Sequence, residues 1–407
     1  MIRRLTSICP PRARRPVLVL LLATSLLAMS AFFLLDRFPM VDTLVYRAEG
    51  AAVADGTDLY GFRVTEGKLA ATYPPFAAIL FVPTTWLPVG LLKAAFFAGN
   101  VALLALLVVL SWRFAGLPRR KGLMVAAVAA ALWLEPVFQT LFFGQVNLAL
   151  ACLILWDLGR DDRAPGKGVA LGVAAGIKLT PAVFIVYLLV TGRIKAGLTA
   201  LAAFAGSVLL GVFVLPGASV DFWTRRLFET DRVGKTWIID NQSLQGLVTR
   251  VLHTTDSGWV WPLAAAVCGG AALWLARRAH LTPGRGDRWG VTITAGTALL
   301  VSPISWSHHF VWCVPVIAVL VASGYQRTAL AVTVVFASRS LWLVPHQGDM
   351  DLHMAWWQQP LASPYAVVTL VLFAAAAWQL RTPAPLTDAA VPRAQPRSAP
   401  PEPAGHL

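Results

Sequence analysis

Charged residues are scarce in this sequence. Asp, Glu, Lys and Arg together make up 13% of the 407 residues, whereas soluble domains contain about 25%. Hydrophobic residues reach 57%, and apolar runs of membrane-spanning length recur between Val17 and Leu380. These features exclude a soluble protein and a soluble domain with a single membrane anchor. They predict an all-α, polytopic transmembrane helical bundle, because the runs do not alternate as the strands of a membrane barrel do.

Cysteine is also rare. The four cysteines are scattered, three of them lie inside apolar segments, and none forms a CxxC or Cys/His spacing. A disulfide framework and a zinc site are therefore not supported. The sequence also lacks a phosphate-binding P-loop, a GxGxxG fingerprint and a nucleophile elbow in a suitable context, which argues against a nucleotide-driven machine.

Acidic residues are outnumbered 20 to 34 by Lys and Arg, so the net charge is +14. The basic residues cluster in short loops between apolar runs, a pattern typical of cytoplasmic loops that orient a membrane protein. We therefore expect no nucleic-acid partner. The expected cytoplasmic segments are 119–121, 160–167, 193–195, 277–288 and Arg327.

Between these basic loops the apolar runs pair as hairpins. The three hairpins are 122–136 with 143–158, 168–177 with 179–191, and 289–303 with 308–323. With segment 75–112 counted as one net crossing, the chain is predicted to form about twelve transmembrane helices with both termini cytoplasmic. Several runs are shorter than the ~20 residues of a perpendicular span, so neighbours must shield them and they should flank a polar cavity.

This topology leaves three long extracytoplasmic loops, at 36–74, 217–258 and 346–363. Residues 1–381 are expected to form the transmembrane domain. The stretch 382–407 is rich in Pro and Ala and lacks periodicity, so we expect a disordered cytoplasmic tail there.

Each hairpin carries polar residues at its outer apex. The first contains Gln145 and Asn147, the second Lys178, and the third the pair His308 and His309. Polar residues inside apolar hairpins are costly and are usually functional or paired. A single lysine is also consistent with snorkelling to the membrane interface, but three polar apices on one predicted face favour a site.

Two outer loops contain further candidates. Asp42 stands about seven residues beyond the first helix, beside aromatic residues, where a carboxylate with a tuned pKa can act as a general base; the alternative is a helix N-cap. Arg225 and Arg226 run against the positive-inside trend, which indicates phosphate binding or a solvated amphipathic helix. The stretch from His346 to His353 shows no metal-ligand spacing on a helix.

Taken in order, these motifs resemble those of glycosyltransferase family 87, the actinobacterial polyprenyl-phosphate-mannose-dependent α-(1→2)-mannosyltransferases of GT-C architecture. The resemblance covers about residues 36 to 320. The motifs are Asp42 to Tyr46, Gly56 to Tyr60, Tyr73-Pro74-Pro75-Phe76, Gly144-Gln145-Val146-Asn147, Lys178-Leu179-Thr180-Pro181, Asn241-Gln242-Ser243-Leu244 and Ser302 to His309.

The resemblance implies an inverting transfer of mannose from a polyprenyl-phosphate donor to a hydroxyl of a glycolipid or lipoglycan acceptor. The reaction would occur at the extracytoplasmic face of the cell membrane, among membrane lipids. It assigns the general base to Asp42 and a place near the donor phosphate to His308 or His309, between which the sequence does not choose. The substrate-binding candidates are Tyr46, Arg47, Tyr73, Gln145, Asn147, Lys178, Arg225, Arg226, Asn241, Gln242 and Trp306.

No metal or other cofactor is expected, because a phosphate departs as a stable anion that cations and hydrogen-bond donors can stabilise. Two alternatives stay open. An arabinofuranosyltransferase that uses a polyprenyl-phosphate pentose would share these motifs. A lipid or solute transporter would also use broken helices and buried charges, although the sequence has no inverted internal repeat and its polar motifs lie mainly in the outer loops.

Overall fold

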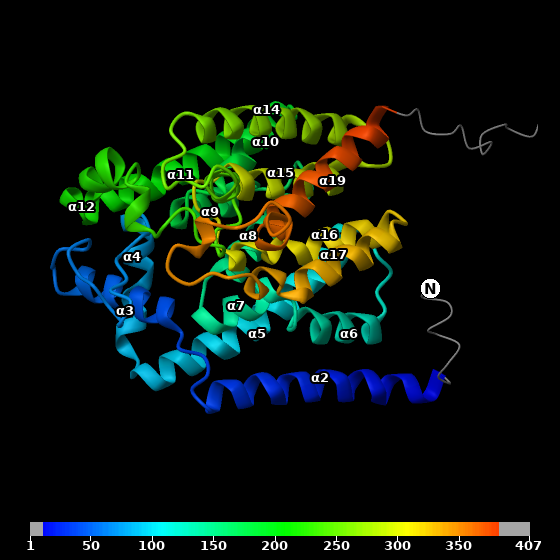
Figure 1. Ribbon diagram of the computed structural model, residues 1–407, viewed down its shortest axis with the longest axis horizontal. Coiled ribbons are helices and arrows are strands. Elements are labelled where there is room, and N and C mark those ends of the chain that lie inside the picture. Colours follow the sequence, from blue (N-terminus) through cyan, green and yellow to red (C-terminus); the bar gives the residue numbers. More distant parts are fainter. Residues whose placement is uncertain (1–10, 382–407) are drawn as a thin grey trace, which may run out of the picture.

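The computed structural model describes residues 11–381, and within them the regular secondary structure is helical, joined by turns and irregular loops (Figure 1). The only β-type pairings in this range are two isolated bridges, one of which joins Asn241 and Trp306. The prediction of an all-α fold is confirmed. The proposed tail at 382–407 lies outside the described residues.

Among the residues that the structure describes, five helices are long and apolar enough to cross a membrane. A sixth span results if α6 (Lys121–Ala131) and α7 (Glu135–Phe143), which meet at a 66° bend, are counted as one broken crossing. Several spans in one chain make this a multi-pass membrane protein. The five long helices are α2 (Pro11–Leu34), α5 (Val89–Phe114), α11 (Ile194–Val214), α14 (Val260–Leu281) and α19 (Pro364–Arg381).

The predicted hairpins contain shorter helices that meet at polar apices, and the bent pair α6 and α7 belongs to the first hairpin. The bounds of the others are α8 (Asn147–Leu158), α9 (Val169–Ile177), α10 (Ala182–Val190), α15 (Gly286–Val301) and α16 (Cys313–Ala322); α17 (Gln326–Ser338) follows the third hairpin. They pack against the long helices, α9 against α11 and α15 against α14. Such helices are too short to span a bilayer upright, and the count of about twelve crossings stays a prediction.

Glycines set the close approach of α9 to α11. Gly168, Gly172 and Gly176 recur at every fourth residue, so they lie on one face of α9. A Cβ atom at any of them would collide with the backbone of Ala196 or Ala200 or with the side chain of Ser207. Small residues at this spacing allow two helices to pack at backbone distance within a membrane.

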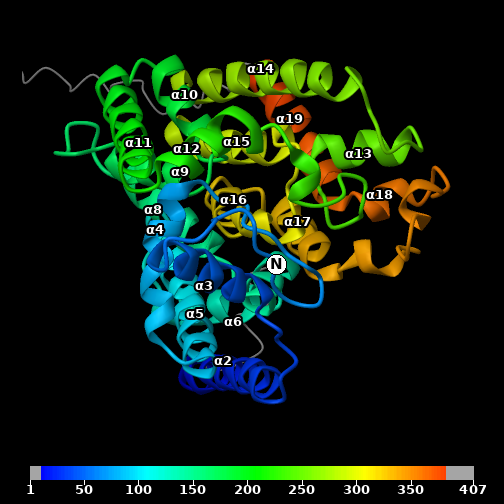
Figure 2. The ribbon, with the colours of Figure 1, turned by 90° about the vertical axis from the view of Figure 1, so that its left-hand side faces the viewer.

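The loops that the sequence predicts to face outward, which we continue to call the outer loops, form a cap at one end of the bundle. This cap includes α3 (Val41–Ala54), α4 (Pro75–Phe81) and α12 (Pro216–Asp221), which lie on the left in Figure 1, and it faces the viewer in Figure 2. The start of α2 and the end of α19 both lie at the opposite end. The remaining elements are α13 (Leu244–Val251), α18 (Gln359–Ala362) and short turns at Val82–Trp86, Phe222–Arg226, Thr230–Arg232, Ser307–Trp312, Ser340–Leu343 and Met350–Leu352.

Candidate active site

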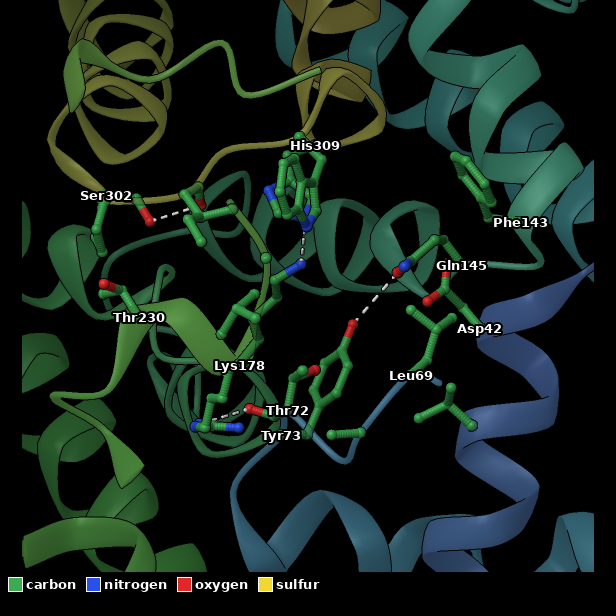
Figure 3. A pocket seen from close by; sticks show the side chains of 18 of the residues that line it. Asp42, Leu69, Thr72, Tyr73, Phe143, Gln145, Lys178, Thr230, Ser302 and His309 are labelled. Atoms are coloured by element: carbon green, nitrogen blue, oxygen red, sulfur yellow. Dashed lines mark hydrogen bonds between the residues drawn. The ribbon is translucent and has the colours of Figure 1, made fainter. Parts of the chain in front are cut away.

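A cavity of about 550 Å³ lies between the cap and the apices of the short helices. Its wall combines the start of α3 with the loop before α4, the Gln145 and Lys178 apices, the loop from 222 to 240, and the segment from Ser302 to His309. Figure 3 shows Asp42 beside Gln145, with the Lys178 and His309 pair across the cavity from them. Segments that are far apart in the sequence therefore meet at one place.

Asp42 lies in the first turn of α3, one residue after the helix begins at Val41. It is not the N-cap, because Met40 occupies that position and makes no side-chain capping bond. The N-cap alternative therefore does not describe this helix. The Asp42 carboxylate is half-buried and lines the cavity instead.

A hydrogen-bonded cluster supports Asp42 from behind. The Gln145 Oε1 accepts from the hydroxyl of Tyr46 at 2.7 Å and from that of Tyr73 at 3.3 Å. Because both tyrosines occupy its oxygen, Gln145 can offer only its amide N–H to Asp42, with which it forms a side-chain hydrogen bond. Tyr46 and Tyr73 are thus placed by the structure behind the carboxylate.

Burial raises the pKa of Asp42 to about 6, although the hydrogen bond from Gln145 and the charge of Lys178 oppose the shift. α3 is not among the membrane-spanning helices, so this carboxyl group belongs to the cap. A base whose pKa lies just below neutral is ionised at physiological pH and still holds a proton well enough to accept one. The environment of Asp42 suits a general base.

Lys178 forms the cationic side of the cavity. It follows the last residue of α9, where Ile177 ends the helix and Lys178 is in an extended conformation. Its Nζ lies 2.8 Å from Nε2 of His309 and 3.2 Å from Oδ1 of Asn147, and it lies 5.6 Å from the ring centroid of Tyr73. These contacts hold the Lys178 ammonium group inside the protein, whereas a lysine that snorkels would extend to the membrane surface.

The two adjacent histidines differ in their surroundings. His309 shares a hydrogen bond with Lys178. His308 lines the cavity with 3% of its surface exposed, and neither of its ring nitrogens has a hydrogen-bond partner among residues 11–381. Buried polar atoms are normally paired, so His308 has two nitrogens available for a bound molecule.

The predicted arginines lie farther out. Arg226 lines the cavity and its Nε donates to Asp221 Oδ2 at 2.8 Å. Arg225 pairs with the same aspartate, its side chain is 58% exposed, and it does not line the cavity. Arg47, on α3, also lies outside the lining, and its buried Nε has no hydrogen-bond partner in the part of the chain that the structure describes. The structure therefore brings only Arg226 of these three to the cavity.

Residues 71–303, more than half of the chain, match the model of glycosyltransferase family 87. The chain is 33% identical over 378 residues to the polyprenol-phosphate-mannose-dependent alpha-(1-2)-phosphatidylinositol mannoside mannosyltransferase of Mycobacterium tuberculosis. The aligned region covers 86% of this chain and 87% of that protein. The chain belongs to glycosyltransferase family 87. It is therefore a membrane glycosyltransferase, as the motifs predicted.

Other members of the family are similarly close. A protein of the same name from Mycolicibacterium smegmatis is 34% identical over 368 residues, with 82% of each chain covered. A phosphatidylinositol pentamannoside mannosyltransferase from Mycobacterium tuberculosis is 34% identical over 329 residues, with 78% of this chain and 75% of that protein covered. No solved structure matches the chain significantly.

In this glycosyltransferase Asn241 and Gln242 are fully buried and do not line the cavity. The Asn241 amide donates to the carbonyls of Thr236 and Pro303 and accepts from the backbone N–H of Ser305. Gln242 in turn bonds the carbonyls of Ile239 and Ala362 and the N–H of Tyr365. Both side chains therefore fasten the second outer loop to neighbouring segments, and their contact with substrate stays a prediction.

Trp306, by contrast, lines the cavity. It lies beside Asn241 in the isolated bridge, and a Cβ atom on Gly234 would come within 2.8 Å of its ring. Gly234 has φ 148°, a conformation in which glycine is favoured. The indole is thus packed against the backbone of the second outer loop with one side toward the cavity.

The sequence-based set of site residues lacked a second carboxylate in the cavity, that of Asp240. It lines the cavity wall, and the backbone N–H of Ser307 donates to its Oδ1 at 3.2 Å. Burial raises the pKa of Asp240, and its charge also contributes to the raised pKa of Asp42. The sequence gives one indication of Asp240, which is its position directly before the Asn241-Gln242-Ser243 motif in a predicted outer loop.

Proposed function

We propose that this protein transfers a mannosyl residue from polyprenyl-phosphate-mannose to a hydroxyl group of a phosphatidylinositol mannoside glycolipid, with inversion at the anomeric carbon. The proposal rests mainly on one observation: Asp42 lies across a single cavity from Lys178 and His309. The names of the similar proteins supply the donor and the class of acceptor.

In the proposed reaction Asp42 removes the proton from the acceptor hydroxyl, and the acceptor oxygen attacks the anomeric carbon of the donor sugar. The bond between this carbon and the phosphate oxygen breaks, and polyprenyl phosphate leaves as an anion. A single carboxylate on the side of attack is sufficient because the leaving group needs charge stabilisation rather than a proton.

Lys178 is the proposed partner of the donor phosphate. His308 offers a second contact, since both of its ring nitrogens are unpartnered and it lines the same cavity. His309, already bonded to Lys178 at 2.8 Å, positions the ammonium group. The proposal needs no metal ion, because these side chains supply the donors and positive charge that the departing phosphate requires.

Asp240 is proposed to accept hydrogen bonds from sugar hydroxyls. An ionised carboxylate has acceptor sites only, which suits a ligand rich in hydroxyl groups. Its position in the same cavity as Asp42 supports a contact with the sugar whose anomeric carbon reacts. Arg226 also lines the cavity, and we propose that it pairs with an anionic group of the glycolipid.

We propose further that the cavity opens at the extracytoplasmic face of the cell membrane. The support is the location of the basic loops: Arg160 and Arg288, for example, lie at the ends of α8 and α15 opposite the cavity. Basic loops normally remain cytoplasmic, so the opposite end would face outward.

The decisive experiment is a transfer assay with the purified protein in lipid nanodiscs. Radiolabelled polyprenyl-phosphate-mannose and polyprenyl-phosphate-arabinose are supplied separately with phosphatidylinositol mannosides, in the presence of EDTA. We expect label from mannose alone in the glycolipid, with EDTA having no effect. Transfer of arabinose alone would identify the pentosyltransferase alternative, and movement of unmodified lipid across the bilayer without transfer would favour a transporter.

A further inference from the structure

A second cavity, of about 440 Å³, lies at the end of the bundle opposite the active site. α8 connects the two regions: Asn147 at its start bonds Lys178, and Leu158 at its end lines the second cavity. α15 also connects the two regions. It begins at Gly286, which lines the second cavity, and ends directly before Ser302, which lines the active site. At 1.5 Å per residue the separation is about 18 to 24 Å.

Four arginines converge on this second cavity from three separate segments. Arg113 comes from the end of α5, Arg160 from just after α8, and Arg285 and Arg288 from the start of α15. We call these four residues and the space between them the arginine cavity. Bringing four like charges together is unfavourable unless an anion or other partner compensates them.

The arginines are only partly satisfied by the protein. Arg160 pairs with Asp157 and lies over the ring of Trp156, and Arg288 donates to the carbonyl of Ala115. Within residues 11–381, Arg113 and Arg285 form no side-chain hydrogen bond or ion pair with the protein. Two guanidinium groups are therefore free to bind an external anion.

The acidic residue of the arginine cavity does not neutralise it. Asp287 lines the same space, but its Oδ1 lies 2.8 Å from Arg193 and accepts a hydrogen bond from Tyr187 at 2.9 Å. His280 contacts the same oxygen at 3.0 Å. The charge of Asp287 is thus directed to a neighbouring cluster, and the arginine cavity keeps an excess of positive charge.

The loop that carries Arg285 is shaped by glycine. Gly284 and Gly286 flank this arginine with φ values of 79° and 52°, and a Cβ atom on either would meet open space. Residues with side chains rarely adopt this backbone conformation. The two glycines let the chain turn sharply on both sides of Arg285 at the rim of the cavity.

We propose that the arginine cavity binds the phosphodiester headgroup of an anionic phospholipid in the membrane leaflet that faces away from the active site. Guanidinium groups match phosphate oxygens in planar, bidentate geometry. Basic pockets between transmembrane helices at the cytoplasmic side are a recognised type of lipid-headgroup site. The site is separate from the donor and acceptor cavity and does not depend on the proposed sugar transfer.

Native mass spectrometry of the full-length protein, delipidated and then titrated with phosphatidylglycerol or phosphatidylcholine, tests this site. We expect the wild type to retain phosphatidylglycerol in preference to phosphatidylcholine. The double variant Arg113→Gln/Arg285→Gln should bind phosphatidylglycerol roughly 30-fold more weakly, since each arginine near a lipid phosphate contributes on the order of 1 kcal/mol. The matched control is Arg119→Gln/Arg120→Gln, which removes two exposed arginines from the same end but outside the cavity.

Equal retention of phosphatidylglycerol by the wild type, the cavity variant and the control would overturn the proposal. Inorganic phosphate, added alone in a thermal-shift assay, separates a lipid site from a general phosphate site: if it reproduces the whole stabilisation that phosphatidylglycerol produces, the lipid assignment is wrong. Folding is checked by the unfolding temperature without lipid. If the double variant does not fold, Arg285→Gln alone, a change in a loop, should still weaken lipid binding by a factor of roughly 5.

Discussion

The start of α3 and the Asn241-Gln242 segment both present polar motifs in outer loops, yet the structure uses them differently. Asp42 is half-buried at the cavity wall and supported by one side-chain hydrogen bond. Asn241 and Gln242 have no exposed surface, and their amide groups bond the backbone of distant segments. A polar motif in such a loop therefore either faces the cavity or stabilises the backbone around it. The two cases differ in how many of the polar side-chain atoms already have a hydrogen-bond partner within the protein.

The largest expected effect is at Asp42. Asp42→Asn should lower kcat by roughly 10³-fold, because removal of a general base costs about 10²- to 10⁴-fold, while binding of the lipid-linked donor persists. The measurement combines steady-state transfer with equilibrium binding of donor. Asp36→Asn is the control, since the Asp36 side chain is 87% exposed. Full activity of Asp42→Asn would remove this residue from the reaction.

Lys178→Met should reduce kcat/KM by roughly 10²-fold, the scale of losing one group that stabilises developing negative charge. Binding of the donor should weaken as well, since the ammonium also contacts the ground-state phosphate. Lys195→Met, an exposed lysine in a predicted cytoplasmic loop, is the matched control. If both variants behave alike in the transfer assay, Lys178 is not the phosphate ligand.

Asn241→Ala should act on stability more than on chemistry. It leaves the carbonyl of Thr236 and the N–H of Ser305 without their partner, which costs about 1–3 kcal/mol for each buried group left unpaired. Thermal unfolding should occur at a clearly lower temperature, and the remaining folded enzyme should keep a normal donor KM. Gln347→Ala, at an exposed site in the third outer loop, should leave both unchanged. A raised KM without loss of stability would instead indicate direct substrate contact.

The acid limb of the pH profile of kcat/KM should lie near the Asp42 pKa of about 6. The base must be ionised to accept a proton, so activity falls as pH drops through this value. Gln145→Leu removes a hydrogen bond that lowers this pKa, and the limb should therefore move to higher pH. A profile that does not move would show that Gln145 does not tune the base.

The smallest effect concerns Glu49, which lies on the same helix as Asp42. It is 1% exposed, one of its oxygens lacks a partner, and burial raises its pKa to about 8 from a usual 4.5. A raised carboxyl pKa gives stability that is complete below pH 4.5 and is lost as pH rises through about 8. The unfolding temperature of Glu49→Gln should vary less over this range than that of the wild type. Parallel curves would mean that Glu49 ionises freely in the fold.

The sequence alone predicted the helical membrane fold, the family and several of the polar residues that line the cavity. Charge scarcity and long apolar runs depend only on composition and order, because lipid excludes unpaired backbone groups whatever the packing. The polar apices at Gln145, Lys178 and His308 were visible for the same reason, since polar residues in apolar hairpins are rarely without a use. The family model and the similar proteins agree with that prediction.

Tertiary structure decided what each polar residue contacts. It separated His308, with free ring nitrogens, from His309, bonded to Lys178; it buried Asn241 away from the cavity and added Asp240 to its wall. These outcomes depend on pairings between residues that are far apart in the sequence, such as Thr140 and the carbonyl of His308, which are 168 positions apart. Sequence order records which residues are polar, whereas the packing of distant segments determines which of them remain available to a substrate.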